Sequence, residues 1–323
     1  MNKITLAWCL IGLVLIGCAS VKPKEIGQKD LIIENNVLVK YTGSARAIII
    51  PDNLGITRIG REAFEKSKIV SVVIPKGVTT IDRNAFYYCE KLTNVELPDT
   101  LKTIGYSAFD RCTIPRLKLP ASVTSIDEIL YWDVGNWEVD EANTYYAALD
   151  GVLFDKNITR LIYYSQHKTE QSYTVPKTVT TIGKYAFKWA KSLKQIILPE
   201  NLKEIEHDAF WGSGITSISI PSTVTSMRSN AFNECRSLIR LTFPEGSITA
   251  VSRGAFLNCI SLQEVYLPKS VETIESKAFQ ACYELMAIHL YENTFIHESA
   301  IVDAYGDNLT HLFRNKGVFK IRQ

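Results

Sequence analysis

The sequence predicts an α/β repeat protein, a solenoid of stacked units of about 22–24 residues that each hold a short strand and a short helical turn. Ala-Phe pairs recur, with phenylalanines spaced by 22, 23, 78, 23, 22, 24 and 23 residues, at Phe64, Phe86, Phe109, Phe187, Phe210, Phe232, Phe256 and Phe279. A proline after an apolar residue keeps the same period, at Pro51, Pro75, Pro98, Pro120, Pro176, Pro199, Pro221, Pro244 and Pro268. Because a unit of this length cannot bury its apolar residues alone, the units have to stack on one another.

One complete unit, residues 92–112, reads "LTNVELPDTLKTIGYSAFDRC". The apolar side chains expected to point inward are those of Leu92, Val95, Leu97, Leu101 and Ile104. The alternation from Val95 to Leu97 predicts a short strand, which Pro98 ends because proline has no amide N–H to donate. Ala108 and Phe109 are expected to begin the helical turn.

The pattern L-x-x-V-x-L-P-x-x-L-x-x-I-x-x-x-A-F-x-x-C resembles the BspA-like leucine-rich repeat family over most of residues 31–290. The resemblance implies a right-handed solenoid with a parallel β-sheet face made by the "xVxLP" segments and short helical turns opposite. It also implies association with cell surfaces, and adhesion to host proteins or to other cells.

Five repeats place a cysteine three residues after the phenylalanine, at Cys89, Cys112, Cys235, Cys259 and Cys282. The other repeats have Ser67, Ala190 or Ser213 there, so the position requires a small side chain, and we expect buried thiols. No clustered ligands support a metal site. Disulfides between neighbouring repeats are the alternative in an exported protein, but adjacent coils are expected to lie too far apart for them.

The first residues predict export. "MNK" precedes an apolar run too short to span a bilayer comfortably, and Leu15-Ile16-Gly17-Cys18 resembles the lipobox of bacterial lipoproteins. Cys18 would then carry the lipid and anchor the protein to a membrane. A plain signal peptide with a chance cysteine, or an uncleaved membrane anchor, is the alternative. Ala19 and Ser20 do not form the inner-membrane retention signal of some lipoproteins, so outer-membrane placement follows by analogy.

The spacing of the Ala-Phe pairs and the prolines, together with the N-terminal signal, divides the chain into seven parts. These are a lipoprotein signal peptide (1–17), a tether (18–30), an N-terminal cap (31–50), a first repeat array (51–126), an irregular aromatic-rich insertion with hairpins (127–175), a second array (176–290) and a C-terminal cap (291–323). The last cap is expected to hold one or two short helices within residues 296–313 and a final strand, "GVFKI". The aromatic residues of the insertion either fill its core, which we favour, or form an exposed binding patch.

The sequence contains no recognisable catalytic signature, nucleotide-binding loop or zinc motif, and its histidines are scattered. We therefore predict no enzymatic activity, no cofactor, no metal and no small-molecule substrate. An active site in the insertion is the alternative, because Asp127, Glu128, Asp133, Glu138, Asp140 and Glu141 could supply a carboxylate pair. A formal net charge of +2 without a basic stripe argues against nucleic acid as a partner.

Residues that alternate with the inward side chains of the predicted strands should form outward ladders. The candidate binding residues on them are Glu96, Arg116, Lys118, Gln195, Arg240, Thr242, Glu264, Tyr266 and His289. Solenoids use such rigid faces to bind proteins. The predicted function is that of a lipid-anchored adhesion protein on the bacterial surface, for a host-matrix or cell-surface protein. The alternative is a structural or assembly scaffold inside the envelope.

Overall fold

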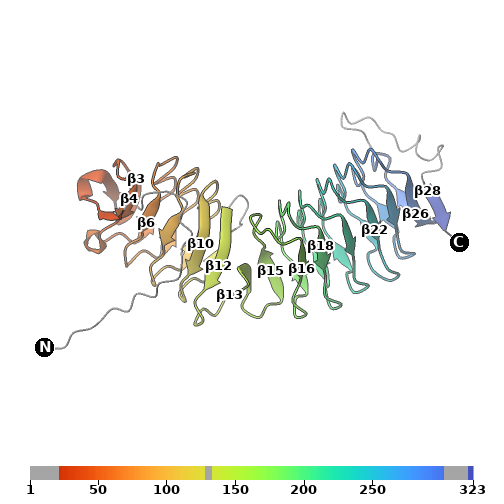
Figure 1. Ribbon diagram of the computed structural model, residues 1–323, viewed down its shortest axis with the longest axis horizontal. Coiled ribbons are helices and arrows are strands. Elements are labelled where there is room, and N and C mark those ends of the chain that lie inside the picture. Colours follow the sequence, from red (N-terminus) through yellow and green to blue (C-terminus); the bar gives the residue numbers. More distant parts are fainter. Residues whose placement is uncertain (1–21, 128–132, 302–318, 323) are drawn as a thin grey trace.

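The computed structural model describes residues 22–127, 133–301 and 319–322. There the chain winds into a solenoid whose coils stack along its long axis, and two arrays of coils meet at a bend beside β12 (Asp133–Val139) (Figure 1). The predicted repeat solenoid is confirmed. The predicted signal peptide, Cys18 and residues 302–313 of the predicted capping helices lie outside the described residues.

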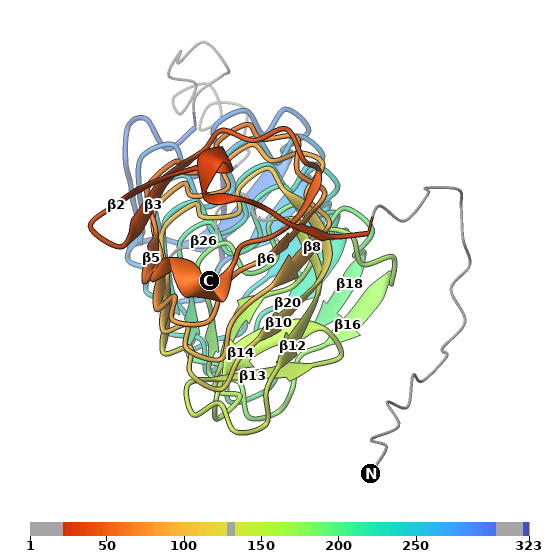
Figure 2. The same ribbon diagram turned by 90° about the vertical axis from the view of Figure 1, so that its left-hand side faces the viewer.

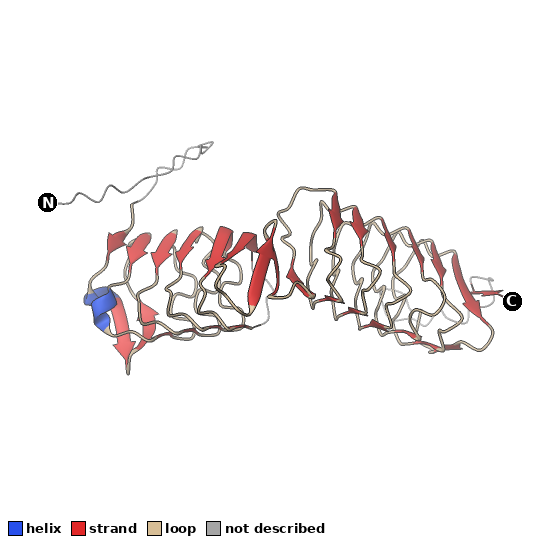
Figure 3. Cartoon of the chain, turned by 90° about the horizontal axis from the view of Figure 1, so that it is seen from below, coloured by secondary structure: helices blue, strands red, loops and turns tan. Residues whose placement is uncertain are grey.

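Each coil contributes one short strand to a face that we call the front face (Figure 3). Its strands are β1 (Lys24–Glu25), β4 (Ala47–Ile49), β6 (Ser71–Val73), β8 (Asn94–Glu96), β10 (Thr113–Leu119), β12, β16 (Ser172–Thr174), β18 (Gln195–Ile197), β20 (Ser217–Ser219), β22 (Arg240–Thr242), β24 (Glu264–Tyr266), β26 (Ala287–Tyr291) and β28 (Phe319–Arg322). They form three parallel sheets, β1-β4-β6-β8, β10-β12 and β16 to β28. The predicted parallel face is therefore present.

A second set of parallel strands, which the sequence patterns do not predict, forms what we call the side face. These strands are β5 (Arg58–Ile59), β7 (Thr80–Ile81), β9 (Thr103–Ile104), β11 (Ser125–Ile126), β17 (Thr181–Ile182), β19 (Glu204–Ile205), β21 (Ser226–Met227), β23 (Ala250–Val251), β25 (Thr273–Ile274) and β27 (Phe295–Ile296). Each has only two residues, which is too short to show an alternation of apolar and polar side chains. Ile104 and its equivalents, which the sequence predicts to point inward without assigning them to a strand, thus lie in strands of the side face.

The predicted helical turns are wrong, because the described residues contain no α-helix. Within the described ranges the helical elements are two short 3-10 helices, η1 (Gln28–Asp30) and η2 (Asp52–Leu54). Around Phe86, Asn84 and Tyr88 adopt left-handed φ values of 59°. The amide N–H of Phe86 donates to the carbonyl of Ala108 in the next coil, at 2.8 Å. These left-handed residues and inter-coil hydrogen bonds replace the i to i−4 bonding that an α-helix needs.

Two antiparallel hairpins interrupt this regular stacking. β2 (Leu31–Glu34) and β3 (Val37–Tyr41) pair before the first array, and β3 continues in parallel with β5. At the bend, β13 (Tyr146–Leu149) and β14 (Val152–Asp155) form a hairpin, β14 pairs with β15 (Arg160–Tyr163), and β15 continues in parallel with β17. Both hairpins therefore lead into the side face of the array that follows. Figure 2 shows the first of them, with β2 and β3 next to β5.

The buried apolar residues form two clusters, one in each array. Their centres are two rows of stacked phenylalanine rings, Phe64-Phe86-Phe109 and Phe187-Phe210-Phe232-Phe256-Phe279. Strand β14 lies between the clusters, because Leu153 packs into the first whereas Val152 and Phe154 pack into the second. The strand is buried on both sides, and this accounts for its continuous apolar run.

The aromatic residues at the bend are mostly packed inside. Trp137, Tyr163 and Tyr164 are buried, Tyr146 is half-buried and Tyr145 is exposed. Tyr131 and Trp132 lie outside the described residues. Since three of the five described side chains are buried in the two clusters, the segment mainly supplies core.

All five repeat cysteines are buried free thiols. Each donates its S–H to the phenylalanine carbonyl one coil earlier, as from Cys259 Sγ to Phe232 O at 3.1 Å. The same contact recurs for Cys89, Cys112, Cys235 and Cys282. A thiol therefore fits the position by its weak hydrogen bond as well as by its small size.

Burial raises the pKa of the Cys235 and Cys282 thiols to about 12 and raises that of Cys259 well above its usual value. Because the thiolate is the reactive species, we expect these cysteines to resist alkylation by iodoacetamide in the folded protein and to react once guanidinium chloride unfolds it. Mass spectrometry of labelled peptides measures this. Tyr283→Cys, at a side chain that is 61% exposed, is the control that should label in the native state. Rapid native labelling of Cys259 would contradict the buried-thiol interpretation.

Candidate binding face

Backbone register aligns the front-face ladders, so that outward residues of neighbouring strands lie beside one another. Gln195, Ser217, Arg240, Glu264 and Ala287 form one row across β18 to β26. Ser219, Thr242, Tyr266 and His289 form the row beside it. The structure therefore brings together the six candidate residues of the second array.

The remaining candidates, Glu96, Arg116 and Lys118, lie on β8 and β10 of the first array. They belong to different sheets, because the parallel ladder is interrupted between β8 and β10. One physical reason is Pro115, which has no N–H at the position where Thr93 donates to Val70 one coil earlier. The candidate residues thus form two groups, one on each side of the bend.

Strand β12 adds residues that the sequence markers missed. Asn136 and Glu138 lie in register with Arg116 and Lys118, and they extend the ladders of the first array by one coil. This coil lacks both the Ala-Phe pair and the proline. The available signal was the match of "VGNWEV" to "IPRLKL" in the coil before, where Val134 and Trp137 are buried like Ile114 and Leu117.

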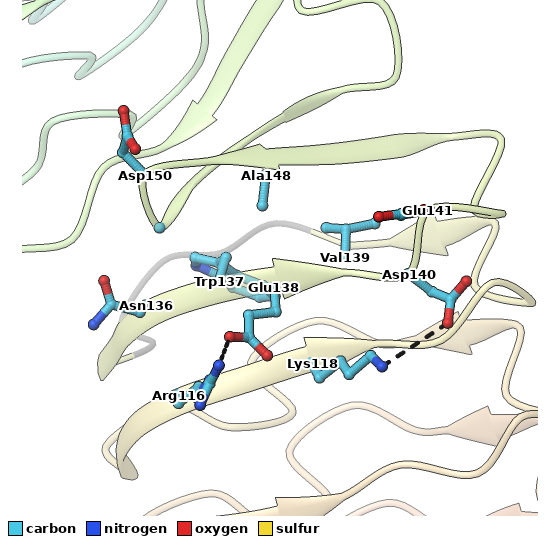
Figure 4. A pocket seen from close by; sticks show the side chains of 11 residues that line it. Arg116, Lys118, Asn136, Trp137, Glu138, Val139, Asp140, Glu141, Ala148 and Asp150 are labelled. Carbon is cyan, nitrogen blue, oxygen red and sulfur yellow. Dashed lines mark ion pairs between the residues drawn. The ribbon is translucent and has the colours of Figure 1, made fainter. Parts of the chain in front are cut away.

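Ion pairs join neighbouring strands of the face. Arg116 pairs with Glu138, and the Lys118 ammonium lies 4.0 Å from the Asp140 carboxylate (Figure 4). In the second array, Arg240 pairs with Glu264 at 2.6 Å. The cations of these pairs are largely exposed and the carboxylates partly so, and each pair therefore contributes about 1 kcal/mol or less to stability. The ion pairs hold the charged side chains in place on the surface, where a partner can reach them.

The C-terminal part of the face carries an aromatic contact. The rings of Tyr266 and His289 stack with centroids 4.1 Å apart and an interplanar angle of 2°. The hydroxyl of Tyr266 also contacts the Glu264 carboxylate, at 3.4 Å. Arginine and tyrosine are among the side chains enriched at the energetic centre of interfaces, and here Arg240 and Tyr266 lie on neighbouring strands.

The face is hollowed where the arrays meet. This junction groove has a volume of about 850 Å³. Its floor is the outer side of β10 and β12, and its wall is the turn after β13, as the positions of Glu138 and Asp150 show in Figure 4. The lining residues are Arg116, Lys118, Asn136, Trp137, Glu138, Val139, Asp140, Glu141, Ala148, Asp150 and Gly151.

Most of the described carboxylates considered for an alternative active site make structural contacts, whereas Glu141 is exposed. Asp127 accepts a hydrogen bond from the Tyr106 N–H at 3.2 Å. Asp133 contacts His167 and accepts a hydrogen bond from Gln166 at 3.0 Å, while Glu138 and Asp140 form the ion pairs above. Glu128 lies outside the described residues. Within residues 22–127, 133–301 and 319–322, no group of His, Cys, Asp and Glu side chains could hold a metal ion. The same residues include no helix that is long and apolar enough to span a membrane.

The family model described as "BspA type Leucine rich repeat region" matches residues 28–138 and 156–286, which is well over half of the chain. The chain belongs to the BspA-type leucine-rich repeat family. Proteins built from such repeats form solenoids that serve as scaffolds for protein interaction. No match was found among curated proteins.

Solved bacterial structures share the fold. A leucine-rich repeat protein from Eubacterium ventriosum is 23% identical, with 89% of each chain covered and a TM-score of 0.67. The pneumococcal vaccine antigen PcpA is 21% identical over 86% of this leucine-rich repeat chain and 79% of its own, with a TM-score of 0.72. A leucine rich cell surface protein from Faecalibacterium prausnitzii is 20% identical over 88% and 96% of the two chains, with a TM-score of 0.53. At these identities the likeness shows the fold alone.

Proposed function

We propose that this leucine-rich repeat protein is a non-enzymatic adhesion protein, exported and anchored by a lipid on Cys18, that binds a host-matrix or cell-surface protein through its front face. The observation that carries the proposal is the pair of outward ladders on β18 to β26, which hold Arg240, Glu264 and Tyr266 in register on a stacked sheet. A preformed surface loses little conformational entropy on binding.

Two lines of evidence support placement at the cell surface. The first residues have the charge, apolar length and cysteine position of a lipoprotein signal. Two proteins of the same fold are a leucine rich cell surface protein and a vaccine antigen. The predicted tether is shortened by the fold, because β1 and η1 already belong to the first array and Ile26 is buried there, so only the residues between Cys18 and Lys24 would act as a tether.

We expect protease added to intact cells to remove this protein rapidly, while a periplasmic control protein stays whole. A Cys18→Ser variant should be lost from the membrane fraction, because it has no site for the lipid. Immunoblotting of the cells and of the membrane fraction measures both effects. Protection of the protein until the envelope is broken would contradict surface adhesion and favour the envelope-internal scaffold.

The face itself is tested by adhesion of the same cells to immobilised fibronectin, collagen and laminin, used as probes of host matrix. The double variant Arg240→Ala, Tyr266→Ala should reduce adhesion about tenfold, since truncation of one central interface residue commonly costs more than 1 kcal/mol. Lys203→Ala with Thr225→Ala, on the side-face surface of the same array, is the matched control. Equal loss in both variants would argue against the front face.

A further inference from the structure

Two adjoining hollows run along the front face at the bend. The junction groove, of about 850 Å³, and a second hollow toward β8, of about 540 Å³, share Arg116, Lys118, Glu138 and Asp140. Together they cross β8, β10 and β12 and end at the wall formed by Asp150 and Gly151. We call this combined feature the extended groove. It is long and open, so it suits an extended chain better than a compact small molecule.

The shape of the extended groove is built into the backbone. The amide N–H of Trp137 donates to the Gly151 carbonyl at 3.1 Å, and this bond joins the floor to the wall. Gly151 has a left-handed φ of 74°, and a Cβ there would overlap the Asn136 side chain. Glycine suits this turn because other residues rarely adopt a left-handed φ of this kind. The groove is therefore preformed, and a ligand would not have to open it.

The charge of the extended groove differs in sign from that of the chain, whose formal net charge is +2. Six carboxylates and two cations line it. The cations, Arg116 and Lys118, are already paired with Glu138 and Asp140. The other four carboxylates have exposed side chains and no ion-pair partner within the described parts of the chain: Glu96, Asp99, Glu141 and Asp150.

We infer that the extended groove binds an extended cationic segment, a stretch of a partner protein rich in lysine or arginine. Its cations would pair with the four unpaired carboxylates, which lie at both ends of the groove and so favour a ligand that spans it. Nucleic acids and acidic glycans would be repelled by the same charges. The inference rests on the proposed function, since it names the class of partner that the first-array part of the face would take.

The test uses the purified full-length chain and two fluorescein-labelled peptides, one alternating lysine with serine and one alternating glutamate with serine. Fluorescence anisotropy at low ionic strength measures their affinities. We expect the lysine peptide to bind, the glutamate peptide not to bind, and added salt to weaken the complex. The variant Glu96→Gln, Asp99→Asn, Glu141→Gln, Asp150→Asn should bind the lysine peptide at least about tenfold more weakly.

The matched control removes the same charge from four exposed glutamates outside the extended groove, in the variant Glu34→Gln, Glu90→Gln, Glu200→Gln, Glu284→Gln. It should bind the lysine peptide as the wild type does. Equal weakening in both variants, or no binding of the lysine peptide to the wild type, would overturn the inference. Either result would leave the outcomes of the protease and fibronectin experiments unchanged. Conversely, protection of the protein inside the envelope would refute surface adhesion but would not alter its affinity for the lysine peptide.

Discussion

Replacing Phe232 by alanine is expected to lower the free energy of unfolding by about 3–5 kcal/mol. Its ring is fully buried and lies between Phe210 and Phe256, with centroids 4.9 Å and 5.6 Å away. Two hydrogen bonds tie the backbone of Phe232 to the following coil, because its N–H donates to Ala255 and its carbonyl accepts from Cys259 Sγ. The coil therefore cannot collapse to fill the cavity, which is what makes such truncations costly.

Urea unfolding followed by tryptophan fluorescence measures the loss. Tyr283→Ala is the control, since this side chain is 61% exposed and its removal should change the free energy of unfolding by no more than about 0.5 kcal/mol. In a stacked array the damage should spread to the neighbouring coils, so amides near Phe210 and Phe256 should also exchange faster with solvent. A loss below about 1 kcal/mol would show that the phenylalanine row does not carry the core of the second array.

Replacing Trp137 by alanine is expected to lower the free energy of unfolding of the first array by a similar amount, about 3–5 kcal/mol. Trp137 is 1% exposed, belongs to the first cluster and meets Tyr163 edge-on, with ring centroids 6.2 Å apart. Tyr163 lies on β15, which continues into the side face of the second array. The indole is therefore a contact between the last coil of the first array and the segment that starts the second.

Hydrogen exchange measured separately over residues 51–126 and 176–290 distinguishes the effects. We expect the first range to lose protection in Trp137→Ala while the second keeps most of its own, because contacts in a solenoid are made only between neighbouring coils. Tyr145→Ala, at an exposed aromatic of the same segment, is the control. A uniform loss over both ranges would instead mean that the arrays unfold as one unit.

Much of the candidate site could be predicted because its residues follow the repeat. Once the period is known, the outward positions are known, and Arg240, Glu264 and Tyr266 were placed on one surface by alternation alone. The extended groove could not be predicted in this way. Its floor needs β12, which lacks the markers, and its wall needs the turn at Gly151, which approaches β12 only in three dimensions.

The sequence by itself determined the family, the period, the inward and outward positions of the front strands, and the burial of the five repeat cysteines. All of these depend on side-chain type repeated at a constant interval, which a single chain displays directly. Only the tertiary structure decided that the Ala-Phe segments are turns rather than helices, and that the two-residue segments form a second sheet. In both cases the deciding hydrogen bonds join residues of different coils, as Phe86 N–H does with Ala108, so no local pattern could show them. The bend has the same origin, since β14 inserts alternate side chains into two separate cores, and a continuous apolar run does not reveal that it is shared.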